Sequence, residues 1–427
     1  MNDILNKIKI NYQKGFFHIF TSNVLNKIFV FCGGILLIRV ISKEDFGLYN
    51  YSQNILSIFL LINGFGITEG LMQYGSKCEP EQQEKYVKYS LKIGIISNIF
   101  LIILMIAYSF WGIFKIEEAR KIFFLMIGFP IINTIFSIIQ IKLRIELKNQ
   151  EMAKISNLNT LFNILGMLFG GYISGIVGVI IGKYIGNIFG ILIASSTIKK
   201  IFFFWKKIND ISLKEKREIN KFSFIAMLNN GISQILYIAD IFLIGIIIAK
   251  KDILASYKTA TLIPMALSFI PLSVMIYVYP YFAKNSQNIN WIRKKYKELL
   301  KYFIIINALI SILLILLSKL IIKIVFGNNY MDCLQPFIVL SIGYFFMATF
   351  RIPSGNIINA IGKLKFNLYG AIISGILNII LDIILIKKYG SIGAAYATTL
   401  IFIISGFIGN IFIFNYLKNR SRYKVLK

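Results

Sequence analysis

Long apolar segments recur along this chain, and they constrain its fold more than any other feature. Twelve segments of roughly 20 mostly apolar residues follow one another, each long enough for a helix to cross a bilayer. They lack the alternation of a β-strand, and a helix satisfies its own backbone hydrogen bonds in lipid. We therefore expect an all-α integral membrane protein. The predicted spans cover residues 17–41, 46–74, 86–111, 122–141, 155–173, 176–198, 222–249, 257–283, 302–326, 333–350, 366–386 and 391–416.

The composition agrees with a membrane protein and excludes an ordinary soluble enzyme. Hydrophobic residues make up 57% of the chain and charged residues 15%, against about 45–50% and about 25% in soluble domains. The three cysteines, Cys32, Cys78 and Cys333, lie far apart, and His18 is the single histidine. This set offers neither a disulfide framework nor a zinc site, so we expect no metal and no cofactor.

The net charge of +28 has its origin in the loops. Of the 47 Lys and Arg residues, 32 lie in segments that a cytoplasmic N-terminus places inside and 9 in segments that it places outside. Because basic residues concentrate in cytoplasmic loops, both termini are expected in the cytoplasm. The same bases would face anionic lipids, so no nucleic acid is needed as a partner. The first span is too long for a signal-peptide core and is expected to be retained.

The second half of the chain resembles the first. Two shifts, of 208 and of 215 residues, bring similar residues into register on either side of the longest polar interruption. We expect a six-helix bundle over residues 1–198, a basic cytoplasmic linker over 199–221, a second bundle over 222–416 and a basic tail over 417–427. Matched residues are Lys43, Glu44 and Tyr49 with Lys251, Asp252 and Tyr257, then Asn163, Gly175 and Gly178 with Asn378, Gly390 and Gly393.

Such parallel repeats are related by a pseudo-twofold axis along the membrane normal, and transporters of this kind hold substrate near the midplane between the repeats. Several spans carry polar stripes that would line such a cavity, although hydrogen bonds between helices are an alternative role for them. The candidate residues are Asn23, Asn26 and Lys27 in the first span, Gln53 and Asn54 in the second, Lys183 in the sixth, Asn230, Gln234, Tyr237 and Asp240 in the seventh, and Lys258 in the eighth.

Charges inside the spans point to the class of ligand. Six bases stand against three acids, Glu69, Asp240 and Asp382. A buried charge costs about 2.5–3.5 kcal/mol, so this excess implies a hydrated, positive cavity that suits an anion such as phosphate. Asp382 lies close enough to a helix end to reach the interface. Asp240 is either the acceptor of a coupling cation or proton, or the partner of Lys27.

Two segments carry a family resemblance. The first is ISKEDFGLY, from Ile41 to Tyr49, and the second is NAIGKLKFNLYGAIISGILNIILDIILIKKYGSIGAAYATTL, from Asn359 to Leu400. In order and spacing they resemble the polysaccharide (O-antigen type, Wzx-like) flippases of the multidrug/oligosaccharidyl-lipid/polysaccharide exporter superfamily. The resemblance covers nearly the whole chain. It implies a transporter fold of twelve helices in two bundles, in a bacterial cytoplasmic membrane.

The resemblance also implies a cargo. It would be a polyprenyl-pyrophosphate-linked oligosaccharide, moved by alternating access to the outer leaflet for O-antigen, capsule or a related glycan, with other polysaccharide-assembly proteins as partners. Related lipid II flippases use bases of their first, second and eighth helices; Lys27 and Lys258 match the first and eighth, and the second has no mid-span base. A drug or organic-cation antiporter of the same superfamily is the alternative, followed by a membrane-embedded glycan polymerase or glycosyltransferase. The chain has no Walker motif, so an ion gradient, the membrane potential or consumption of the product would drive transport.

Overall fold

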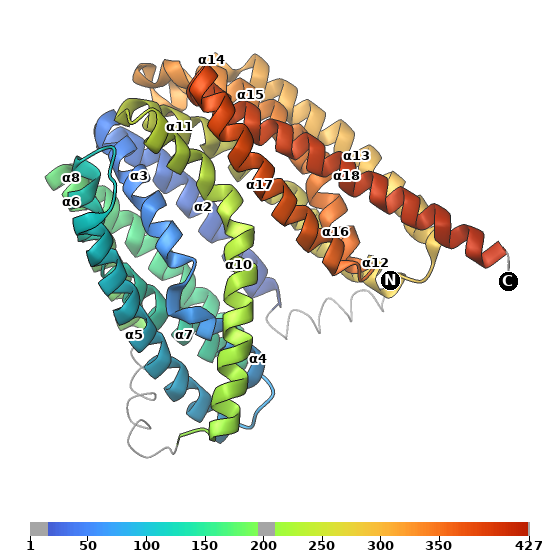
Figure 1. Cartoon of the computed structure of the whole chain (residues 1–427), viewed down its shortest axis with the longest axis horizontal. Helices are drawn as coiled ribbons and strands as arrows, with labels where there is room; N and C mark the ends of the chain where they lie inside the picture. The colour runs from blue at the N-terminus through green and yellow to red at the C-terminus, as the bar shows by residue number, and fades with distance from the viewer. Residues whose placement is uncertain (1–15, 195–209, 426–427) are drawn as a thin grey trace. The chain divides into compact units, whose positions relative to one another are not determined.

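The computed structural model describes residues 16–194 and 210–425, and every element in these ranges is helical (Figure 1). The chain forms two compact units, Met1–Gln234 (unit 1) and Ile235–Lys427 (unit 2). Nine helices of the described ranges are long and apolar enough to cross a membrane. The expected all-α, multi-pass membrane protein is thereby confirmed, while the count of twelve spans stays a prediction.

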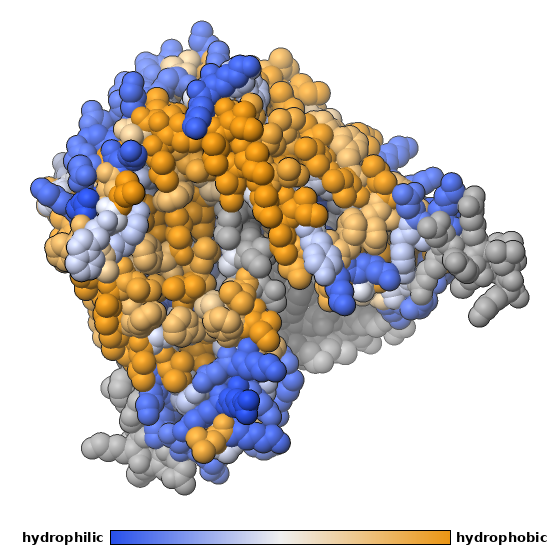
Figure 2. Space-filling view, in the orientation of Figure 1, coloured by the Kyte–Doolittle hydropathy of each residue, from blue (hydrophilic) through white to orange (hydrophobic). Residues whose placement is uncertain are grey.

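Unit 1 is built from long helices with apolar outer surfaces. Helix α2 packs on α8, and α5 packs on α7. Broad apolar bands cover the helices, and hydrophilic residues gather toward their ends (Figure 2). The elements of unit 1 are α2 (Phe16–Val40), α3 (Lys43–Leu60), η1 (Asn63–Gly66), α4 (Ile67–Gly75), α5 (Pro80–Trp111), α6 (Glu118–Leu125), α7 (Phe129–Ile145), α8 (Asn149–Ile193) and the first part of α10 (Leu213–Ile247).

The second predicted span is broken rather than continuous. Between α3 and α4, Gly64, Phe65 and Gly66 all have positive φ angles of 56°, 47° and 69°. Asn98 of α5 accepts a hydrogen bond from the Gly64 N–H at 3.1 Å and donates to the Thr134 hydroxyl at 2.7 Å. A helix break inside a membrane is tolerated when neighbouring side chains satisfy the freed backbone groups, as Asn98 does.

Helix α8 contains the fifth and sixth predicted spans. Its backbone leaves the helical region at Ser174 and Gly175, where Gly175 has φ 55° and ψ −140°. The two arms fold back on each other closely, because a Cβ added to Gly182 would lie 1.8 Å from the Gly166 carbonyl oxygen. Small residues at such crossings let helix backbones approach, which favours packing in lipid.

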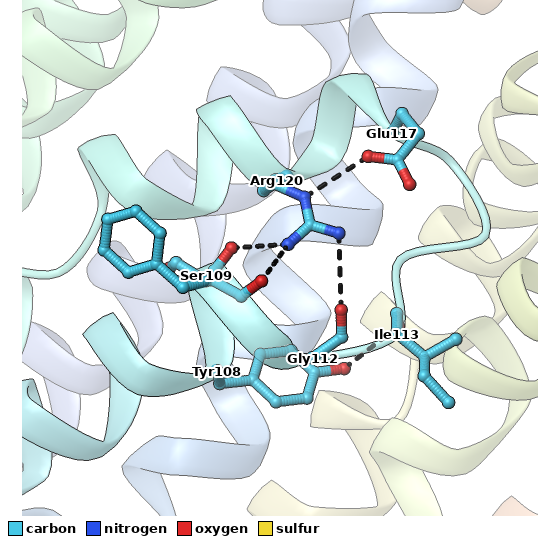
Figure 3. Close-up of polar contacts among 7 residues, drawn as sticks. Tyr108, Ser109, Gly112, Ile113, Glu117 and Arg120 are labelled. Atoms are coloured by element: carbon cyan, nitrogen blue, oxygen red, sulfur yellow. Dashed lines mark hydrogen bonds and ion pairs between the residues drawn. The ribbon is translucent and has the colours of Figure 1, made fainter.

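Arg120 of α6 caps the end of α5 in unit 1 (Figure 3). Its guanidinium donates to the carbonyl oxygens of Ser109 at 2.6 Å, Phe110 at 3.1 Å and Gly112 at 3.4 Å. A further N–H donates to Glu117 at 3.2 Å. The last carbonyls of a helix lack intrahelical partners, so this fork of donors completes the hydrogen bonding of α5.

Unit 2 contains the remaining elements. Helix α18 packs on α15 and α17, and α12 packs on α16. The elements are the second part of α10, then α11 (Lys251–Ala266), α12 (Phe269–Lys284), α13 (Ile289–Leu316), α14 (Ser318–Ile321), the π-helix η2 (Ile322–Phe326), the 3₁₀-helix η3 (Asn328–Cys333), α15 (Leu334–Phe346), the π-helix η4 (Met347–Arg351), α16 (Ile352–Ala360), α17 (Leu364–Tyr389) and α18 (Ser391–Val425).

Two helices of unit 2 extend past their predicted limits. Helix α13 begins at Ile289 rather than at residue 302, because Ile292, Tyr296 and Leu300 form a buried face while lysines occupy the other face. Judged by hydropathy alone, this lysine-rich segment is predicted to be a loop. Arg351, expected in a loop, lies in the helical stretch that runs from α15 through η4 to α16. The predicted linker and tail are only partly described: residues 195–209 and 426–427 lie outside the described ranges.

The predicted repeat has a counterpart in the backbone. Gly175 and Gly390, matched at a shift of 215, have nearly the same unusual angles, φ 55° and ψ −140° against φ 66° and ψ −146°. A Cβ on Gly178 would lie 1.8 Å from the Gly170 carbonyl oxygen, and a Cβ on Gly393 would lie 2.0 Å from that of Leu385. The contacted residues, Gly170 and Leu385, are also related by the shift of 215, so α8 and the pair of α17 and α18 have the same hairpin geometry.

Candidate functional site

A cluster of carboxyl, amide and hydroxyl groups surrounds Asp240 within unit 2. One carboxylate oxygen of Asp240 accepts hydrogen bonds from the hydroxyls of Tyr257 on α11 and Thr398 on α18, both at 2.5 Å. Its other oxygen accepts from the amide of Asn378 on α17 at 3.1 Å. The same amide nitrogen donates to Asp382 at 2.6 Å. These five residues are called the carboxyl cluster below.

Asp382 departs most from the sequence expectation. It was expected to reach the interface, but its side chain is fully buried at 0% exposure. Its Oδ1 atom is buried and has no hydrogen-bond partner among the described residues. Sequence reasoning therefore missed Asp382 and Asn378 as site residues. A signal was present, because the repeat already matched Asn378 with Asn163.

The carboxyl cluster is built to hold a positive charge. Asp240 and Asp382 share one amide donor, which keeps them within the separation of about 4–6 Å over which charges strongly affect each other. The donors to Asp240 are neutral hydroxyl and amide groups of unit 2. Two carboxylates this close in a buried site cannot both stay ionised without a counter-charge. A proton or a cation that prefers oxygen ligands would supply it.

Lys183 of α8 is a predicted cavity residue that makes several contacts within unit 1. Its ammonium donates to the side-chain oxygen of Gln53 at 2.8 Å and contacts the hydroxyl of Tyr49 at 3.4 Å. It also lies 4.9 Å from the centre of the Phe129 ring. Phe129 stacks on Tyr184 at 4.1 Å between ring centres. Unit 1 thus surrounds this predicted cavity residue with its own acceptors and aromatic rings.

The stripe predicted on the first span is divided by the structure. Asn26 donates to the Ser156 hydroxyl of α8 at 2.9 Å, so this side chain joins two helices. Lys27, next to it, is exposed and makes no ion pair with the described residues. The side chain of Asn23 lies outside the described residues. Lys27 is thus an exposed charge of this stripe, and its contact with a ligand stays a prediction.

The other predicted residues are distributed over both units. In unit 1, Asn54 is buried in α3, Asn230 donates to the carboxylate of Glu69 at 3.1 Å, and Gln234 is exposed. In unit 2, Lys258 is half-buried and makes no ion pair with the described residues. The side chain of Tyr237 is not among those described. Whether these residues contact substrate stays a prediction.

Comparison with known sequences gives a family. Residues 12–286, more than half of the chain, match the family described as polysaccharide biosynthesis protein. An uncharacterized membrane protein of Methanocaldococcus jannaschii is 24% identical over 403 residues, covering 85% of this chain and 76% of the relative. A putative O-antigen transporter of Shigella flexneri is 27% identical over 235 residues, 54% of this chain. The match spans about half of that transporter, 51% of its length.

Solved structures share the fold. The lipid II flippase MurJ in an inward closed conformation aligns with a TM-score of 0.75 at 21% identity, covering 94% of this chain and 87% of MurJ. An inward-facing multidrug resistance MATE family transporter aligns with a TM-score of 0.76 at 14% identity, covering 93% and 96%. These likenesses confirm the transporter fold class. The Shigella relative is named as a transporter and the two solved structures as a flippase and a transporter, in agreement with the expectation that the chain is not an enzyme.

Proposed function

Because the chain belongs to the polysaccharide biosynthesis protein family, a family of Wzx-like flippases, we propose that it moves a polyprenyl-pyrophosphate-linked oligosaccharide across the membrane. The direction would be from the cytoplasmic to the outer leaflet, for O-antigen, capsule or a related surface polysaccharide. The family match over residues 12–286 is the observation that carries the proposal. The similarity to a putative O-antigen transporter supports the class of cargo.

Lys27 is the proposed contact to the pyrophosphate in unit 1. An ammonium is a good point-charge partner for phosphate. Lys27 is suited to this role because it is exposed and makes no ion pair with the described residues. Lys183, in contrast, is engaged by Gln53 and Tyr49. Lys258 of unit 2 is the corresponding proposal on the eighth span.

Complementation tests the function. A bacterial strain that lacks its glycan flippase should regain surface polysaccharide when it expresses this chain. Lys27→Ala should lose at least 90% of that polysaccharide at equal membrane expression, and Lys27→Arg should keep most of it because the charge remains. Lys43→Ala, which removes a base at the start of α3, is the matched control and should behave as the parent. A normal amount of polysaccharide with Lys27→Ala would reject the pyrophosphate contact. If the parent chain restored no polysaccharide in strains of several glycan types, the proposed function would be rejected.

The carboxyl cluster is proposed as the coupling site. We propose Na⁺ as its occupant, because carboxyl and hydroxyl oxygens carried by α10, α11, α17 and α18 meet in the cluster, which is more than proton binding needs. The chain has no nucleotide-binding motif to supply energy, so an ion gradient would do so. Cation binding at Asp240 and Asp382 would then bias the conformations of the transporter.

Neutralising the cluster tests this coupling. In the purified protein, Asp382→Asn keeps the shape of the side chain and should remove Na⁺ binding. A ligand that binds the folded state raises the melting temperature, so the variant should also lose the rise that Na⁺ produces. Asp332→Asn, on η3, is the control and should bind Na⁺ as the parent does. If Asp382→Asn bound Na⁺ normally, the coupling site would have to lie elsewhere. Loss of proton binding alone would assign the cluster to H⁺.

A drug or organic-cation antiporter is the second candidate, favoured by the shared fold with a multidrug resistance transporter. Vesicles that contain the purified chain separate the two proposals. A flippase should move a pyrophosphate-linked lipid between leaflets and leave a cationic dye in place, whereas an antiporter should expel the dye against a gradient.

A further inference from the structure

The repeat allows the carboxyl cluster of unit 2 to be compared, residue by residue, with the matching positions of unit 1. Tyr49 matches Tyr257 at the shift of 208, and α3 and α11 begin at the matched residues Lys43 and Lys251. At the shift of 215, Asn163 matches Asn378 and both hairpins carry the same glycine geometry. The register is therefore fixed on both sides of the cluster.

In this register, unit 1 keeps the tyrosine and the asparagine of the cluster and lacks the acids. Cys32 stands at the position of Asp240 and Met167 at that of Asp382. Lys183 stands at the position of Thr398, each eight residues beyond its hairpin glycine, Gly175 or Gly390. The two negative groups of unit 2 are thus replaced by neutral ones, and a hydroxyl is replaced by an ammonium.

The contacts agree with the register. In unit 2 the hydroxyls of Tyr257 and Thr398 meet at one carboxylate oxygen of Asp240. In unit 1 the hydroxyl of Tyr49 lies 3.4 Å from the Lys183 ammonium. The matched pairs, Tyr257 with Thr398 and Tyr49 with Lys183, therefore come together in both units. Gln53 supplies the closest acceptor to the ammonium, at 2.8 Å.

We infer that Lys183 is a tethered cation. Its ammonium occupies the unit 1 counterpart of the proposed Na⁺ site. A mobile cation is excluded there because unit 1 has no carboxylate at Cys32 or Met167, and because the Lys183 ammonium is a fixed positive charge. The transporter is thereby coupled to one cation, bound in unit 2. This inference rests on the proposed coupling site for its ion, although the test below separates the two.

Rebuilding the missing site tests the inference. The full-length triple variant Cys32→Asp, Met167→Asp, Lys183→Thr gives unit 1 the same acids and hydroxyl as unit 2. Equilibrium binding of radioactive Na⁺ to the purified protein in detergent should rise by one ion per chain over the parent. Lys183→Arg keeps the fixed charge and should leave the number of bound Na⁺ ions unchanged. An unchanged number in the folded triple variant would overturn the inference.

A smaller change covers the case in which the triple variant does not fold. Met167→Asp alone adds a carboxylate at the position matched to Asp382, where the backbone packs against Gly182, the neighbour of Lys183. This variant should fold and show no Na⁺-dependent rise in melting temperature beyond that of the parent. Adding Lys183→Thr should create such a rise, because the carboxylate then needs a mobile cation. The same Na⁺ response with and without Lys183 would overturn the inference.

The outcomes for the two proposals remain distinct. A parent chain that binds no Na⁺ would reject the coupling site of unit 2, and an added ion in the rebuilt chain would still support the role of Lys183. A parent chain that binds two Na⁺ ions, one of them lost in Met167→Lys, would reject the tethered cation and leave the coupling site of unit 2 in place.

Discussion

At the scale of single residues, the surroundings of Lys142 could not be predicted from its place in the sequence. By sequence it is a base of a cytoplasmic loop, yet its side chain is 2% exposed at the end of α7. It pairs with Glu84 of α5 and, at 3.0 Å, with Glu146. A buried ion pair adds little net stability, but an uncompensated buried charge is costly. Lys142 therefore links α5 and α7 through its ion pairs, and its burial depends on the carboxylates of Glu84 and Glu146.

This ion pair gives a stability prediction. The double variant Glu84→Gln, Glu146→Gln leaves the Lys142 ammonium buried without a carboxylate and should destabilise unit 1 by about 3–5 kcal/mol. The melting temperature in detergent should fall accordingly. Lys148→Met removes a more exposed base that pairs with Glu146, and it should cost less than about 1 kcal/mol. Equal effects of the two variants would contradict the buried pairing of Lys142.

At the scale of elements, the start of α10 is attached to α5 by hydrogen bonds and ion pairs within unit 1. Asp210 accepts from Lys216 at 3.1 Å and lies 3.7 Å from Lys88. Glu215 accepts from Gln82 at 2.7 Å. The hydrogen bond from Lys216 is the main cause that lowers the pKa of Asp210. A hydrogen bond from the Ser212 hydroxyl is the main cause that lowers the pKa of Glu215.

This attachment should weaken in acid. A carboxyl group whose pKa is lower in the folded state stabilises that state above its unfolded value of about 4, and the stabilisation is lost as the pH falls through the folded pKa. The melting temperature should therefore fall below about pH 4, and Glu215→Gln should reduce the fall. Glu81→Gln, which alters an exposed pair with Lys85, is the control. A fall of the same size in Glu215→Gln and the parent would contradict a stabilising role for the Glu215 carboxylate.

At the same scale, α3 and α13 show which boundaries the sequence could supply. Hydropathy located both helices, because long apolar runs need no tertiary information. It did not show the break at Gly64, which depends on Asn98 from another helix. Nor did it show that α13 begins at Ile289, since a helix with lysines on one face and Ile292 buried on the other reads as polar.

At the scale of the whole molecule, the sequence by itself determined an all-helical membrane protein with two related halves and a flippase-like family. The length of the apolar segments and the similarity between the two halves are properties of the sequence, and they do not depend on how the helices pack. Tertiary structure decided which polar groups meet. Asp240 of α10 and Asp382 of α17 are 142 residues apart in sequence, and only the fold of unit 2 brings both to the amide of Asn378. Periodicity places a residue on a helix face, but the partner across that face depends on the fold.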